Sequence, residues 1–85
     1  MALVITREAA KTAILAEINR AETNPPPWLE RHLFCAIEAV RRGDAELAYA
    51  HVVALRRGPT LEEASKLPGR PLLTTAKLRQ MLERL

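Results

Sequence analysis

The sequence contains few of the residues from which most enzyme and metal sites are built. Its 85 residues include one cysteine, two histidines and one aspartate. A single cysteine cannot form a disulfide within the chain, which excludes a small secreted fold held together by disulfides. The soft metal ligands are His32, Cys35 and His51, one fewer than a structural zinc site needs. We therefore expect no catalytic residues, no cofactor, no metal ligands and no enzymatic activity.

Long apolar runs are also missing. The opening apolar residues end at Arg7 and Glu8, before the apolar core of a secretion signal could form. No stretch approaches the roughly 20 apolar residues that span a membrane. Together with the lone thiol, this predicts a cytoplasmic protein that contacts no membrane.

A strand-like segment is confined to the first five residues, too few to build a sheet. Hydrophobic residues form 48% of the chain and charged residues 27%, with three glycines and six prolines. This composition is typical of a folded helical domain. We predict an all-α fold, a small single-domain bundle of four to five helices over residues 1–85, around a central antiparallel helical hairpin.

Capping residues and prolines divide the chain into helices. Thr6 and Asp44 are predicted N-caps, and the prolines at 25–27 end the first helix and begin the second. Thr60 and Glu63 form a capping box that predicts a short helix over Leu61–Leu67. Thr74 or Thr75 is expected to cap the last helix.

The hairpin is predicted over Pro27–Arg42 and Asp44–Arg57, joined at Gly43. The first of these helices has a wide apolar arc, so we expect it to pack between two others. The second is apolar nearly all round, which predicts a central helix whose burial is completed in part by a second copy of the chain. In such a hairpin His51 lies level with Cys35, so His32, Cys35 and His51 could approach one another. We interpret them as core residues.

Two features predict a surface for a protein partner. Phe34 falls on the polar side of its helix, and the last helix carries a narrow apolar stripe. Such a stripe is typical of helix-in-groove or self-association contacts. The N-terminal segment over residues 3–5 could equally cover both features within the chain. We therefore expect a non-enzymatic interaction module, a homodimer or a binder of another protein, acting through apolar helix faces. The partner-binding residues predicted on this basis are Phe34, Leu78, Met81, Leu82 and Leu85.

An alternative function follows from Thr60–Leu82. Ser65, Gly69 and Leu78 stand where a helix-turn-helix has its small residue, its turn glycine and a packing position, so the segment resembles a degenerate form of that DNA-binding motif. Its pattern departs from the motif at Pro68 and Arg70. In this interpretation the chain is a small DNA-binding regulator, with four residues facing phosphates or bases. These are Thr74, Thr75, Lys77 and Arg79.

Overall fold

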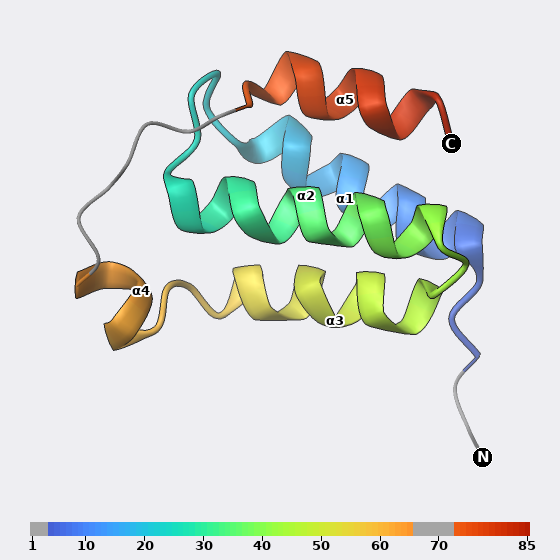
Figure 1. Ribbon diagram of the computed structural model, residues 1–85, viewed down its shortest axis with the longest axis horizontal. Coiled ribbons are helices and arrows are strands. Elements are labelled where there is room, and N and C mark those ends of the chain that lie inside the picture. The colour runs from blue at the N-terminus through green and yellow to red at the C-terminus, as the bar shows by residue number, and fades with distance from the viewer. Residues whose placement is uncertain (1–3, 66–72) are drawn as a thin grey trace.

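A computed structural model describes residues 4–65 and 73–85, and within them the chain forms five helices and no strand (Figure 1). The predicted all-α class is confirmed. The helices are α1 (Arg7–Arg20), α2 (Pro27–Arg41), α3 (Ala45–Arg56), α4 (Leu61–Ser65) and α5 (Thr75–Glu83).

The predicted capping residues begin the helices. The side-chain oxygens of Thr6, Asp44 and Thr74 each accept a hydrogen bond from a backbone N–H three residues later. At α4, Thr60 and Glu63 exchange two bonds, because each side chain accepts from the other's backbone N–H, at 3.0 and 3.1 Å. These bonds satisfy first-turn donors that have no partner within the helix.

Gly43 closes the turn between α2 and α3. Its φ of 85° lies in the left-handed region that glycine adopts without strain. The backbone N–H groups of Gly43 and Asp44 donate to the carbonyls of Val40 and Ala39, at 3.0 and 2.8 Å. This pair of bonds is a Schellman motif, and it turns the chain so sharply that α3 runs back along α2.

The helices are arranged with α1 and α2 in the middle, α3 along one side and α5 along the other (Figure 1). Helix α2 contacts α1, α3 and α5, one neighbour more than the two that its wide apolar arc predicted. One cluster of buried side chains joins these four helices: Ala10, Ile14, Ile18, Leu33, Ala36, Ile37, Ala39, Val40, Ala48, Val52, Leu55, Leu78 and Leu82.

Helix α3 occupies the edge of the bundle, so the prediction that it is central is wrong for the single chain. It packs against α2 and α1 and buries one face, formed by Ala48, Val52 and Leu55. A partly buried ion pair holds it to α1: the Arg56 Nε donates to Glu17 Oε1 at 3.0 Å. The Glu17 side chain is only 5% exposed.

Helix α5 uses its apolar stripe within the chain. Leu78 and Leu82 are buried in the core, and Met81 and Leu85 are half-buried against it. The start of α5 is fixed to the loop after α1, because the Thr75 N–H donates to the Thr23 carbonyl at 3.1 Å. Helices α1 and α2 thus cover Leu78 and Leu82 within the chain, and the partner-binding role of the stripe stays a prediction.

Candidate functional site

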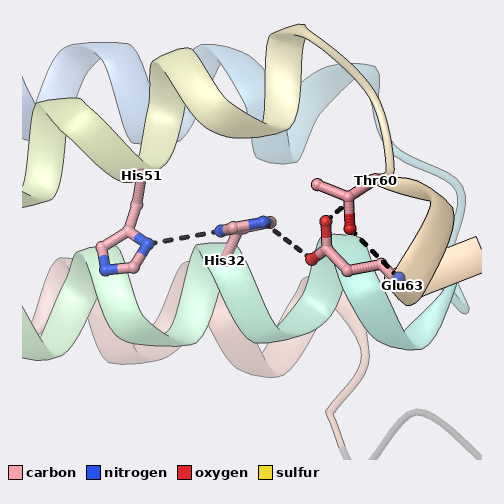
Figure 2. A network of polar contacts seen from close by, with 4 residues as sticks. All are labelled: His32, His51, Thr60 and Glu63. Carbon is pink, nitrogen blue, oxygen red and sulfur yellow. Dashed lines mark hydrogen bonds and ion pairs between the residues drawn. The ribbon is translucent and has the colours of Figure 1, made fainter. Parts of the chain in front are cut away.

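The most organised group of polar side chains joins α2, α3 and α4 (Figure 2). The Nδ1 atoms of His32 on α2 and His51 on α3 lie 3.3 Å apart. The Nε2 atom of His32 lies 3.1 Å from Oε2 of Glu63 on α4. Trp28 packs edge-on against His32, with ring centroids 6.5 Å apart. The result is a continuous chain of contacts from Glu63 through His32 to His51.

The chemistry of the carboxylate sets the direction of the contact with α4. An ionised Glu63 only accepts, so His32 donates from Nε2. In the second contact, between the Nδ1 atoms of His32 and His51, one ring donates and the other accepts. Together the two contacts attach α4 to the helical hairpin.

The surroundings of this group of side chains shift the pKa values of His51 and Glu63. Burial and the neighbouring His32 lower the pKa of His51 from 6.5, so its imidazole is neutral near pH 7. The hydrogen bond from the Thr60 backbone, with help from His32, lowers the pKa of Glu63 from 4.5 and keeps it ionised. At neutral pH the group therefore combines a neutral His51 with an ionised Glu63.

The sequence predicted that His32 and His51 could approach one another, and the structure brings them into contact. Cys35 is partly buried and is a free thiol. Among the described residues, no three or more histidine, cysteine, aspartate or glutamate side chains are grouped so that they could hold a metal ion. The contact between the histidines and Glu63 was not foreseen, because only the placement of α4 in space reveals it.

Phe34 lies at the surface, with 37% of its area exposed. It is two positions from His32, and two positions on an α-helix are about 200° apart. Because His32 contacts α3, Phe34 is on the side of α2 that points away from α3. Of the five predicted partner-binding residues it is the most exposed, and its binding role stays a prediction.

Of the four residues predicted to bind nucleic acid, three make contacts within the chain and the fourth is exposed to solvent. Thr74 caps α5 and Thr75 is buried, whereas Lys77 is exposed. The Arg79 Nη2 donates to Asn19 Oδ1 at 2.9 Å. The turn glycine of the resemblance, Gly69, lies outside the described residues.

The two helices of that motif do not pack together. Helix α4 lies beyond the end of α3, and α5 lies on the opposite side of α1 and α2 (Figure 1). A helix-turn-helix holds its two helices against each other so that the second is presented to the major groove. The arrangement of α4 and α5 in the chain is different from this.

The outer side of α3 carries an apolar surface whose residues the sequence did not identify, although it predicted that a second copy of the chain would cover part of this helix. Leu47 is 40% exposed, Ala50 is exposed, and Val53 and Ala54 are partly exposed. These side chains come from one helix and lie opposite its buried face. The sequence signal for this surface was the nearly continuous apolar character of residues 45–55. It predicted that most of the helix is buried, but not which side of the helix another molecule would cover.

Comparison of the chain with protein-family models, with curated proteins and with solved structures gave no match. Within residues 4–65 and 73–85, none of the helices combines the length and the apolar character needed to cross a bilayer.

Proposed function

We propose that the chain is a non-enzymatic interaction module that associates with a second copy of itself through the outer face of α3. The observation that carries this proposal is the apolar surface formed by Leu47 and Ala50, which are exposed, and by Val53 and Ala54, which are partly exposed. Apolar side chains grouped on one exposed face are typical of protein contacts, because covering them releases ordered water. The free thiol of Cys35 suits a reducing compartment, so we propose a cytoplasmic location.

Other exposed apolar residues give less support to a shared surface. Val4 precedes the first helix, Leu15 is on α1 and Leu61 is on α4, so each belongs to a different element. Phe34 is on the side of α2 opposite to α3. Single exposed apolar residues are common on monomeric proteins, whereas α3 offers two exposed and two partly exposed apolar residues on neighbouring turns of one helix.

The first test is the mass in solution, measured by light scattering over a range of protein concentrations at low and high salt. We expect a dimer that persists at high salt, because apolar association does not depend on charge screening. A monomer at every concentration would contradict the proposal. A parallel run with a duplex DNA fragment tests the alternative: a mass shift with DNA that disappears at high salt would favour a DNA-binding regulator.

The second test places a charge on the proposed surface. Ala50→Glu should convert the dimer to a monomer, because the carboxylate would have to be desolvated against the second copy. The fold of the single chain should survive, since the side chain of residue 50 is exposed and glutamate is a good helix former. Ala9→Glu, at an exposed alanine of α1, is the matched control and should remain a dimer.

A further inference from the structure

The outer face of α3 also carries a pattern of charge that selects one geometry of self-association. Glu46, Ala50, Val53 and Arg57 follow one another at spacings of four, three and four residues. These spacings place side chains in one stripe along a helix. The stripe therefore has an acid at one end, a base at the other and two apolar residues between them.

Read in the opposite direction, the spacings are again four, three and four. From Glu46 to Arg57 the helix advances about 16 Å and turns about 20° more than three full turns. Two copies of α3 packed antiparallel thus bring Glu46 of each chain to Arg57 of the other and Ala50 to Val53. The same surface serves both chains, as a two-fold axis requires.

Both charges are available for this contact. Glu46 and Arg57 are exposed, and neither takes part in an ion pair within the described part of the chain. By contrast, the neighbouring Arg56 is held by Glu17. Ala50 is small, so two α3 helices can approach closely along the centre of the stripe.

We infer that the partner of the α3 face is a second copy of this chain in antiparallel two-fold register, fixed by two symmetry-related pairs of Glu46 with Arg57. This inference rests on the proposed self-association and adds its geometry. The pairs are exposed, so they contribute register and specificity more than affinity. The apolar residues between them supply most of the contact.

Charge reversal at one end of the stripe tests the register. E46R alone places two arginines opposite each other at both ends of the interface, and R57E alone places two glutamates there. Each variant should raise the dimer dissociation constant about tenfold or more, because two attractive pairs become repulsive. An equimolar mixture of the two variants should form a heterodimer, since arginine then faces glutamate at both ends. The E46R/R57E double variant should dimerise with itself again.

Matched controls exclude effects of the substitutions on the helices themselves. Glu8 is the second residue of α1, as Glu46 is of α3, and Arg42 is the C-cap of α2, as Arg57 is of α3. Glu8→Arg and Arg42→Glu should leave the dissociation constant unchanged. Circular dichroism melting curves confirm that each variant is folded before its mass is interpreted.

The outcomes separate the geometry from the proposed function. A wild-type dimer that is unaffected by E46R and R57E overturns the antiparallel register but leaves self-association in place. Single variants that weaken the dimer but do not recover on mixing also overturn it. A wild-type chain that is monomeric throughout overturns the proposed function, and the inference with it. Native mass spectrometry of the mixture, with one variant isotopically labelled, identifies the heterodimer directly.

Discussion

At the scale of single residues, the contacts from Glu63 through His32 to His51 make the stability of the folded protein depend on pH. The pKa of His51 is lowered in the folded chain, so near pH 6.5 the unfolded chain binds more protons at this residue than the folded one. For a group whose folded pKa is lowered, the stabilisation is present above the unfolded value. It is lost as the pH falls through the folded value.

We therefore expect the free energy of unfolding, measured by urea titration, to be lower at pH 5.5 than at pH 7.5. His51→Gln removes the titrating group and should reduce this difference. If the free energy of unfolding fell by the same amount between pH 7.5 and pH 5.5 in the wild type and in the variant, His51 would not be the source of the pH dependence. Glu30→Gln is a useful comparison, because burial raises the pKa of Glu30 and its titration acts on stability in the opposite direction.

At the scale of helices, α5 shows the difference between an apolar stripe and an available surface. Periodicity indicates that a helix has an apolar face, but it does not say whether the same chain or another one covers that face. Leu78 and Leu82 are covered within the chain, whereas the outer face of α3 is left exposed. The physical reason is that α1, α2, α3 and α5 share one small core. The helices at the edge of this bundle each keep one face that no other helix of the described chain covers.

The covering of α5 can be tested by stability. Leu78→Ala should lower the free energy of unfolding by about 2–5 kcal/mol, because it leaves a cavity in the core. Leu61→Ala is the matched control, since Leu61 is 92% exposed, and should change it by less than about 0.5 kcal/mol. Both are measured by urea titration in the Ala50→Glu background, where the proposed association is removed. A small effect of Leu78→Ala in that background would contradict intrachain burial.

Local signals were sufficient for the start of three helices. Thr6, Asp44 and Thr74 act as caps because a side-chain oxygen and a free N–H lie within one turn of each other. The contact of His32 with His51 also followed from the short turn at Gly43. Glu63 could not be added to this pair from sequence, because the path from α3 to α4 depends on loop geometry rather than on periodicity.

At the scale of the whole molecule, the two exposed apolar sites point in different directions. Phe34 faces away from α3, so one flat contact cannot include both Phe34 and the outer face of α3. An antiparallel contact through α3 closes after two copies, because each chain uses the same surface. A contact between the two different sites would instead repeat from chain to chain, so the solution mass at high concentration also distinguishes a closed dimer from open assembly.

The tight turn at Gly43 has a further consequence, for the order in which the chain folds. The turn joins α2 and α3 through very few residues, whereas α1 and α5, which pack together, are separated by most of the sequence. Contacts that close short loops form with the smallest loss of chain entropy. The hairpin is therefore expected to be formed at the folding transition state, with α5 docking later.

Stopped-flow kinetics can test this order. Ala48→Gly, within the hairpin, should slow folding, and Leu78→Ala should mainly accelerate unfolding. If Leu78→Ala slowed folding as much as Ala48→Gly, α5 would already be docked in the folding transition state, and the expected order would be wrong. A late-docking α5 implies that newly made chains pass through a state in which the apolar stripe of α5 and the α5-facing side of α1 are briefly uncovered.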